Sequence, residues 1–377
     1  MPISLTRQRP NQLKAIGGII TNNRINVLLV FVPVGILCGY LELSSSWVFF
    51  TNFFAIIPLA AVLSDTTECV AASVGDTLGG ILNATFGNVV ELIVAVVALY
   101  RRQIRIVQTS MLGSILSNLL LVLGISFIAG GWGRLQQTFN QTAAQTMSSL
   151  MVLACISLLL PAAFHASVPN SYKIEVVQVS RYVSIVLLLI YVACLYFQLK
   201  SHRMFFENES TGEENEEPEL TLRSSLALLA GTTLVVAACA EYLVGSIDDI
   251  VKTTSMTQTF IGLILLPIVG NAAEHVTAVY MAMKDKINIT LNVAIGSSLQ
   301  IALFLVPFLV LCGWVIDVPM SLFFDQFETV VLFVSVYIAN SLIMDGESNW
   351  LEGLLLVGVY IIIAVMFYFF PDVNVKV

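Results

Sequence analysis

Two short motifs place a carboxylate inside otherwise apolar stretches of this 377-residue chain. Gly87-Asn88-Val-Val-Glu91 returns 183 residues later as Gly270-Asn271-Ala-Ala-Glu274. On a helix, residues three and four apart share a face, so each motif presents an amide beside a carboxylate. A carboxylate at the centre of a membrane helix costs roughly 2.5–3.5 kcal/mol on insertion scales, and acids at such positions are usually functional. The two motifs therefore predict one site with oxygen ligands from both halves of the chain.

Further polar residues accompany the motifs. Glu68 and Glu241 each lie one apolar stretch earlier. Gly87 and Gly270 allow neighbouring helices to approach closely, and Pro267 can break the backbone hydrogen-bond ladder and free carbonyl groups. The stretch that follows each motif adds hydroxyl and amide oxygens, from Ser114, Ser117, Asn118, Ser297, Ser298 and Gln300.

This set of side chains favours a hard cation. Ca²⁺ accepts flexible coordination by six to eight oxygens, whereas Mg²⁺ demands tighter octahedral geometry and keeps its waters. A single histidine in this set, His275, and the absence of convergent cysteines make a dedicated zinc or copper site a poor fit, and Mn²⁺ stays open. His275 could relay protons, but on a helix its side chain points about 100° away from that of Glu274, which favours a structural role.

A structural interpretation of the polar residues also exists. Polar side chains in membrane helices can simply hold helices together, at about 0.6–2 kcal/mol each. That interpretation has least force for Glu91 and Glu274, because they form a duplicated pair, and more for Glu68 and Glu241. For the serines and amides of the following stretches, both interpretations stay open.

The composition indicates an all-α polytopic membrane protein. Hydrophobic residues make up 57% of the chain and charged residues only 11%, and the mean hydropathy is +0.89; soluble domains carry about 25% charged residues. The apolar stretches are continuous and long enough to span a bilayer as helices. We therefore expect the lipid bilayer as a partner. The net charge is −8 and the sequence has no basic patch, so we do not expect a nucleic acid as a partner.

The hydropathy pattern predicts about eleven transmembrane helices. They are expected near residues 25–43, 47–72, 80–100, 106–130, 146–165, 180–199, 222–245, 258–283, 290–313, 325–344 and 350–370. We expect a cytosolic tail (1–24), an extra first helix (25–43), a five-helix repeat (47–199), an acidic cytosolic linker (200–221), a second five-helix repeat (222–370) and a C-terminal tail (371–377).

The two repeats are expected to be inverted. The motifs fall in the third and eighth spans, five apart, so the chain enters the second copy from the opposite side of the membrane. Inverted repeats are a recurring transporter architecture, with the substrate site near the midplane at the repeat interface. With a cytosolic N-terminus, the cytosolic segments hold ten Lys and Arg residues and the other side seven, which favours that orientation modestly.

The motifs resemble those of the Ca²⁺/H⁺ exchanger (CAX) family, within the cation/Ca²⁺ exchanger superfamily, and most closely its fungal vacuolar members. The resemblance runs through nearly the whole chain and is carried by residues 82–91, 108–118, 139–149, 270–275, 296–300 and 345–353. It implies eleven helices in two inverted five-helix repeats and a Ca²⁺ site built on Glu91 and Glu274. It also implies that Glu68 and Glu241 line the vestibule or gate, that Gln300 and neighbouring serines add polar contacts, and that the membrane is vacuolar.

The paired acids suit an antiporter. An empty site would carry two negative charges through a poorly solvated state, which is costly, whereas one Ca²⁺ or two protons neutralise the pair. We therefore expect Ca²⁺ and H⁺ to be exchanged by alternating access, with no resident cofactor. A Na⁺-coupled or Mn²⁺-preferring exchanger on the same fold and, more remotely, a cation channel are the alternatives. An enzyme is not expected, because Glu274-His275 lacks the spacing of a zinc protease.

Overall fold

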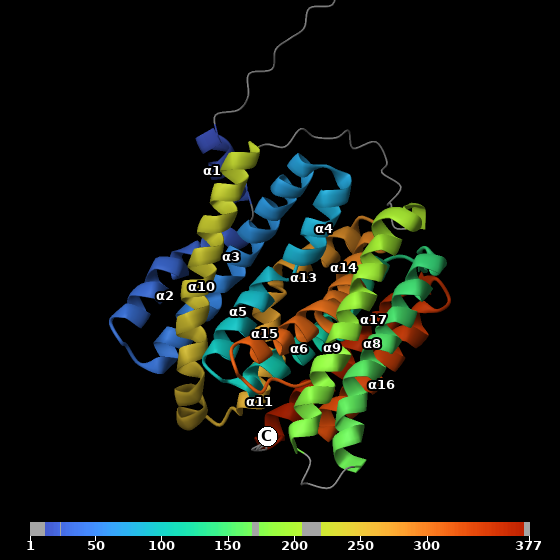
Figure 1. The fold of residues 1–377 in the computed structure, drawn as a ribbon. Helices are drawn as coiled ribbons and strands as arrows, with labels where there is room; N and C mark the ends of the chain where they lie inside the picture. Colours follow the sequence, from blue (N-terminus) through green and yellow to red (C-terminus); the bar gives the residue numbers. More distant parts are fainter. Residues whose placement is uncertain (1–11, 23, 168–172, 206–219, 373–377) are drawn as a thin grey trace, which may run out of the picture.

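The computed structural model describes residues 12–22, 24–167, 173–205 and 220–372, and in these ranges the protein is almost wholly helical (Figure 1). Eight helices there are long and apolar enough to cross a membrane, and two further helix pairs reach that length only across a bend. The expected fold class, an all-α polytopic membrane protein, is confirmed. The count of eleven spans stays a prediction.

The first half of the chain forms the elements α1 (Gln12–Asn22), η1 (Arg24–Val30), α2 (Phe31–Tyr40), α3 (Ser45–Val74), α4 (Asp76–Phe86), α5 (Val89–Tyr100), α6 (Ile104–Leu116), η2 (Ser117–Val122), α7 (Leu123–Gly131), β1 (Gln137–Thr138), α8 (Gln141–Ser167), α9 (Lys173–Tyr196), η4 (Phe197–Ser201) and η5 (Arg203–Phe205). The expected N-terminal tail thus contains a helix, α1. Residues 1–11 and 23 of the expected tail, and residues 206–219 of the acidic linker, lie outside the described residues.

The second half forms α10 (Leu222–Thr253), α11 (Gln258–Phe260), η6 (Ile261–Leu265), α12 (Leu266–Gly270), α13 (Ala272–Met283), α14 (Ile287–Gln300), η7 (Ile301–Leu305), α15 (Val306–Val315), α16 (Gln326–Ile343), β2 (Glu347–Ser348) and α17 (Trp350–Phe369). Local sequence fixes several helix starts. Asp325 with Glu328, and Asn349 with Glu352, form capping boxes that satisfy the first backbone N–H groups of α16 and α17.

The two halves repeat the same elements at the 183-residue offset. Helices α5 and α13 begin at Val89 and Ala272, and α6 and α14 begin at Ile104 and Ile287. The corresponding elements run in opposite directions: α3 joins α4 at the top of Figure 1, whereas α10 leads to α11 at the bottom. This arrangement agrees with inverted repeats, which the parity of the spans predicts.

Both motif-bearing segments are broken helices rather than the single spans expected at 80–100 and 258–283. Helix α4 ends at Phe86, and α5 begins only after Asn88, whose φ of −105° and ψ of 34° lie outside the helical range. In the second half, the segments on either side of Asn271 meet at 57°. Pro267 lies in the first turn of α12, directly after the π-helical segment η6, and the bend itself follows four residues later. Hydropathy measures apolarity and not backbone direction, so it cannot register such breaks.

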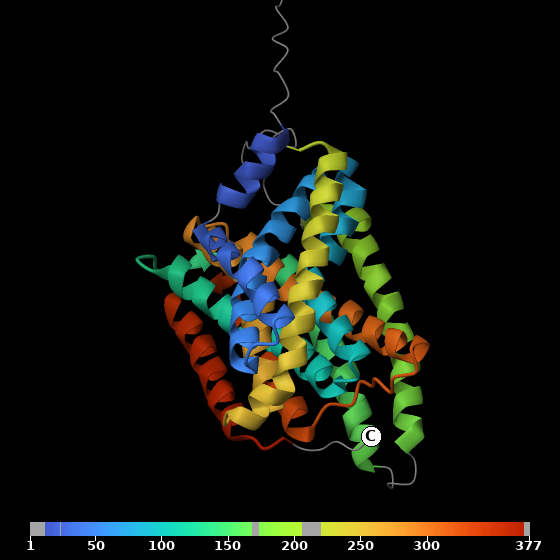
Figure 2. The ribbon, with the colours of Figure 1, turned by 90° about the vertical axis from the view of Figure 1, so that its left-hand side faces the viewer.

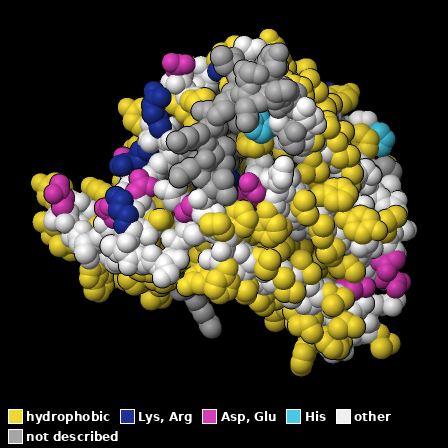
Figure 3. All heavy atoms as spheres, turned by 90° about the horizontal axis from the view of Figure 1, so that it is seen from below, with side chains coloured by type: hydrophobic (Ala, Val, Ile, Leu, Met, Phe, Trp, Pro, Cys, Tyr) yellow, Lys and Arg dark blue, Asp and Glu magenta, His cyan; other side chains and the backbone are white. Residues whose placement is uncertain are grey.

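The broken helices pack against α3 and α10. These two long helices run side by side through the molecule in both ribbon views (Figures 1 and 2). A short β1–β2 pairing, Gln137 opposite Ser348 and Thr138 opposite Glu347, joins the loop before α8 to the loop before α17. The outer helices expose large apolar side chains, among them Leu189 and Val192 of α9 and Ile362 and Val365 of α17, as a lipid-facing surface requires. Seen from below, apolar side chains gather on the right-hand part of the molecule, and Lys and Arg side chains lie on the left (Figure 3).

Candidate functional site

The breaks at Asn88 and Asn271 bring the two motif glutamates to the same region. Glu91 lies in the first turn of α5 and is buried, with 6% of its surface exposed. A Cβ on Gly270 would lie 3.0 Å from Glu91 Oε1, so this carboxylate from the first half touches the helix break of the second half. Glu274 lies in the first turn of α13, within electrostatic reach of Glu91. The positive end of each helix dipole favours the ionised carboxylate there.

A hydroxyl group of α14 and an amide group of η2 hold Glu274 in place. Ser297 Oγ donates to Glu274 Oε1 at 2.8 Å, and Asn118 Nδ2 approaches Glu274 Oε2 at 3.5 Å. The Ser297 bond arises within the second half, whereas Asn118 comes from the first half. Glu274 is thus bound by groups from both repeats.

The two motif asparagines make cross-repeat contacts of the same kind. Asn88 Nδ2 donates to Gln300 Oε1, and Asn271 Nδ2 donates to Asn118 Oδ1 at 3.2 Å. Each amide therefore uses its nitrogen to reach the other half. The opposite atoms, Asn88 Oδ1 and Asn271 Oδ1, are buried and make no hydrogen bond, and neither does the buried Ser114 Oγ. A buried acceptor left unsatisfied costs about 1–3 kcal/mol, and a bound cation would offset this cost for each oxygen that it contacts.

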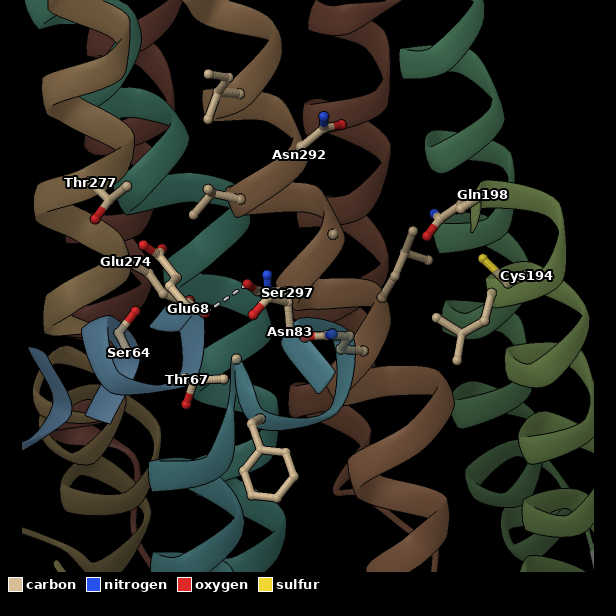
Figure 4. Close-up of a pocket in the computed structure, with 18 of the residues that line it drawn as sticks. Ser64, Thr67, Glu68, Asn83, Cys194, Gln198, Glu274, Thr277, Asn292 and Ser297 are labelled. Atoms are coloured by element: carbon tan, nitrogen blue, oxygen red, sulfur yellow. Dashed lines mark hydrogen bonds between the residues drawn. The ribbon is translucent and has the colours of Figure 1, made fainter. Parts of the chain in front are cut away.

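Two cavities adjoin the glutamates and differ greatly in size. A vestibule of 440 Å³ is bordered by Glu274, Glu68 and Ser297 together with polar groups of α3, α4, α9 and α14 (Figure 4). Glu91 faces only a pocket of about 20 Å³, which it shares with Ser114 and Gly270. The smaller pocket has room for about one water molecule. The site is therefore open at Glu274 and closed at Glu91.

Not every residue expected near the site reaches it. Glu241 pairs with Arg101, whose Nη2 and Nε lie 2.5 Å and 2.9 Å from Glu241 Oε1, and it does not border the vestibule that holds Glu68. Ser298 Oγ donates to the Ala294 carbonyl of its own helix and does not border the vestibule, so its expected contribution to the site stays a prediction. The preceding helical turn uses the hydroxyl proton of this serine, whereas its oxygen keeps lone pairs.

His275 faces away from the vestibule. Its Nε2 lies 3.1 Å from Ser117 Oγ, at the start of the π-helical segment η2. His275 and Ser117 thus tie α13 to the η2 segment, and neither borders the vestibule. A proton-relay role for His275 stays a prediction. Among the described residues, no group of three or more His, Cys, Asp and Glu side chains could hold a metal ion, so cation binding here depends on two carboxylates and neutral oxygens.

Comparison with known proteins decides the family. The sequence pattern of the sodium/calcium exchanger proteins matches residues 44–200 and 224–369. The chain belongs to this family. It is 49% identical over 357 residues to the vacuolar calcium ion transporter of Schizosaccharomyces pombe, covering 94% of this chain and 87% of that protein. It is 43% identical over 364 residues to a Ca²⁺/H⁺ antiporter of Aphanothece halophytica, covering 92% and 96%.

A solved structure agrees with these relatives. The fold of this chain matches that of native YfkE with a TM-score of 0.79 at 35% sequence identity. The match covers 92% of this chain and 100% of the YfkE chain. YfkE is described as a Ca²⁺/H⁺ antiporter. The resemblance to the Ca²⁺/H⁺ exchangers that the motifs indicate is confirmed.

The structure adds residues to the exchanger's site that the sequence interpretation missed. Tyr191 of α9 hydrogen-bonds to Gln300, the residue that accepts from Asn88. Asn83, Gln198 and Thr277 border the vestibule (Figure 4). None of these residues belongs to the duplicated motif. Polar side chains of the same types also occur at lipid-facing and linker positions, so only the fold identifies these residues as part of the site.

Proposed function

We propose that this chain is a secondary active antiporter that exchanges Ca²⁺ for H⁺ by alternating access and moves cytosolic Ca²⁺ into an acidic compartment, the vacuole. The relatives named above as a vacuolar calcium ion transporter and a Ca²⁺/H⁺ antiporter support this assignment. The family name also includes sodium, so a Na⁺-coupled or Mn²⁺-preferring exchanger is the competing candidate. The proposed substrates are Ca²⁺ and H⁺.

The meeting of two carboxylates with unsatisfied neutral oxygens carries the proposal. Glu91 and Glu274 come from opposite halves, and Asn88 Oδ1, Asn271 Oδ1 and Ser114 Oγ lack donors around them. Oxygen ligands of this kind suit Ca²⁺, which tolerates irregular coordination. Ligands divided between two repeats can also be separated when the repeats move, and a transport site must release its ion.

Charge neutralisation explains the coupling. Two ionised carboxylates enclosed without a counter-ion pay a large desolvation penalty. One Ca²⁺ removes the net charge, and so does one proton on each of Glu91 and Glu274, and both use the same oxygens. Only the loaded forms therefore cross the occluded state at a useful rate. A low pH on one side releases Ca²⁺ there and loads the protons that return the carrier.

Flux measurements in proteoliposomes test this function. With an acidic lumen and neutral outside medium, we expect saturable ⁴⁵Ca²⁺ uptake that disappears when a protonophore collapses the pH gradient. Protein-free liposomes and proteoliposomes without a pH step are the controls. Added Na⁺, Mn²⁺ or Mg²⁺ reveals competing cargo. Uptake that needs a Na⁺ gradient, or that proceeds without saturation and without any pH step, would contradict Ca²⁺/H⁺ exchange.

A further inference from the structure

Arg105, in the first turn of α6, forms a buried ion pair outside the proposed cation site. Its Nη1 lies 3.0 Å from Glu328 Oε2, and its Nη2 lies 2.5 Å from Glu328 Oε1. The Glu328 side chain is fully buried, and that of Arg105 is only 15% exposed. A cation is unfavourable beside the positive end of a helix dipole, so α6 itself gives no reason for an arginine here. The contacts of Arg105 with other elements supply that reason.

The same guanidinium reaches a third element. Arg105 Nη2 also donates to Thr259 Oγ1 at 3.2 Å, and Thr259 is completely buried. Thr259 belongs to α11, which begins the broken motif helix of the second half and lies at the bottom of Figure 1. The guanidinium is a planar fork with five donors, so it can hold a carboxylate and a hydroxyl at once. Arg105 therefore joins α6, α16 and α11.

The segment that begins with α11 is the one that closes the site. It comprises residues 258–270, that is α11, η6 and α12, and is called the gate segment below. All three of its elements pack on α6. A Cβ on Gly262 would collide with the Thr109 side chain, and a Cβ on Gly113 would collide with the Leu263 carbonyl. Opening of this side therefore requires the gate segment to leave α6.

The corresponding segment of the first half is open. At the 183-residue offset, α4 matches residues 259–269, and α14 matches α6. Among the described residues, α4 packs mainly on α3 and has no contact with α14 of the extent seen between η6 and α6. The vestibule lies between them, with Asn83 of α4 and Gly296 of α14 on its border. The two halves thus show the same pair of elements closed in one repeat and open in the other.

The residue at the Arg105 position differs between the repeats. Its counterpart is Asn288, in the first turn of α14. Asn288 Oδ1 accepts the backbone N–H of Asn140, directly before α8, at 2.8 Å. Each half thus ties this turn to the start of a helix of the other half. An asparagine amide is uncharged and has donors on one nitrogen only, whereas the guanidinium is a charged fork.

We propose that Arg105 is a positioning residue of the transport cycle, and that its hydrogen bond to Thr259 biases the carrier toward the vestibule-open state. Glu328 anchors the guanidinium throughout the cycle. The bond to Thr259 forms when the gate segment packs on α6 and breaks when the segment leaves. The asparagine at the matching position gives the other gate no charged fork, so the vestibule-open state is the resting state. This inference rests on the alternating access of the proposed function.

The size of the bias follows from the kind of bond. Loss of a buried hydrogen bond with a charged donor changes an equilibrium by about tenfold or more. Asp248 and Asp372 also bind α11, through the Gln258 side chain and two backbone N–H groups. Removal of the Thr259 hydroxyl should therefore raise the population of the opposite state about tenfold, while the closed gate stays the more populated state.

Thiol labelling can report opening of this gate. Ser110 of α6 is buried and borders the small pocket of Glu91, and η6 covers it, since a Cβ on Gly262 would lie 3.6 Å from its backbone nitrogen. In Ser110→Cys, a charged methanethiosulfonate reagent reaches the thiol when the gate segment leaves α6. Labelling of detergent-purified, Ca²⁺-free protein is followed by peptide mass spectrometry. Adding Thr259→Val, which keeps the branched shape and removes the hydroxyl, should speed this labelling about tenfold.

Native cysteines distinguish an opened gate from a loosened bundle. Cys194 borders the vestibule (Figure 4), and Cys239 is completely buried in α10. In Thr259→Val, Cys194 should be labelled at an unchanged or lower rate, and Cys239 should stay unlabelled. A double-mutant cycle tests Arg105 itself: once Arg105→Gln has removed the bond, Thr259→Val should have no further effect. An undiminished effect in that background would show that the hydroxyl acts without Arg105.

Thr329→Val is the matched control, because the Thr329 hydroxyl lies in the same region and donates to the Gln326 carbonyl of its own helix at 2.7 Å. It should change labelling of Ser110→Cys less than twofold. The proposal is overturned if Thr259→Val leaves that labelling unchanged, if it exposes Cys239 equally, or if Thr329→Val has the same effect. Because labelling needs no cargo, a failed flux assay with the expected labelling would refute the Ca²⁺/H⁺ assignment and not the gate.

Discussion

At the residue scale, the two central carboxylates are equivalent in the sequence and different in their surroundings. Glu274 is bonded to Ser297 at 2.8 Å and borders the vestibule. Glu91 is buried against Gly270 and faces a pocket of about 20 Å³. An ion that arrives through the vestibule therefore meets Glu274 first. Glu91 completes the site from the closed side.

Neutralising either carboxylate should abolish exchange. Glu91→Gln and Glu274→Gln keep the side-chain shape but remove the charge that binds Ca²⁺ and the group that carries the proton. We expect pH-driven Ca²⁺ uptake to fall about 100-fold in each, because losing one member of a buried charged site costs several kcal/mol. The measurement is initial ⁴⁵Ca²⁺ uptake in proteoliposomes at matched protein content.

The control for this experiment is Asp317→Asn, an equally conservative change in an exposed loop, at a left-handed position that asparagine tolerates. Its uptake should equal that of the unaltered protein. Substantial uptake by either glutamine variant would show that the central site does not depend on that carboxylate.

At the element scale, the breaks in the motif helices matter more than their length. Each break ends one helix and begins another at the asparagine, which leaves first-turn N–H groups without intrahelical partners beside the motif glutamate. The π-helical segments η2 and η7 lie directly after Leu116 and Gln300 in the facing helices. Such segments are rare and often occur at functional sites.

The close approach of α6 and η6 predicts unequal effects of one substitution at two matched glycines. A Cβ at Gly113 would collide with the Leu263 carbonyl and with Pro267, which cannot move without separating the helices. Overpacking of this kind costs about 1–3 kcal/mol. We expect Gly113→Ala to lower the melting temperature in detergent by several degrees.

Gly296→Ala is the internal control, because this glycine occupies the same position in the second half and has open space around it. Its melting temperature should stay close to that of the unaltered protein. Equal destabilisation by the two alanines, measured by thermal unfolding with a thiol-reactive dye, would mean that α6 and α14 are packed alike.

At the scale of the whole molecule, one side of the site is open and the other closed. The 440 Å³ vestibule reaches Glu274 between α3, α4, α9 and α14, while η6 packs on α6 at the other side. Glu68 near the end of α3 and Gln198 in η4 border the vestibule. The end of α3, the end of α9 and the start of α10 lie at the same end of the molecule, at the top of Figure 1. With the expected orientation, that end faces the cytosol, where Ca²⁺ would be captured.

Protons and Ca²⁺ reach the site from the same solution, so Ca²⁺ binding should depend on pH. Protons and Ca²⁺ use the same carboxylate oxygens, so Ca²⁺ affinity should fall as the pH falls. The decrease should approach about 100-fold per pH unit where binding releases two protons, and about tenfold in Glu274→Gln, where only one carboxylate remains. Calorimetric titration of Ca²⁺ in detergent between pH 6 and pH 8 measures this slope. An affinity independent of pH would contradict direct competition.

The sequence alone determined the membrane class, the duplication and the carboxylate pair. Composition and long apolar runs require helices in a bilayer, and the repeat of Gly-Asn-x-x-Glu at 183 residues does not depend on conformation. Only the tertiary structure decided that the motif helices break at Asn88 and Asn271, that Ser298 bonds to its own helix, and that Glu68 faces the vestibule while Glu241 is paired. The physical reason is that two similar repeats can adopt different packings at little cost in free energy. The sequence encodes what the halves share, and the structure shows which half is closed.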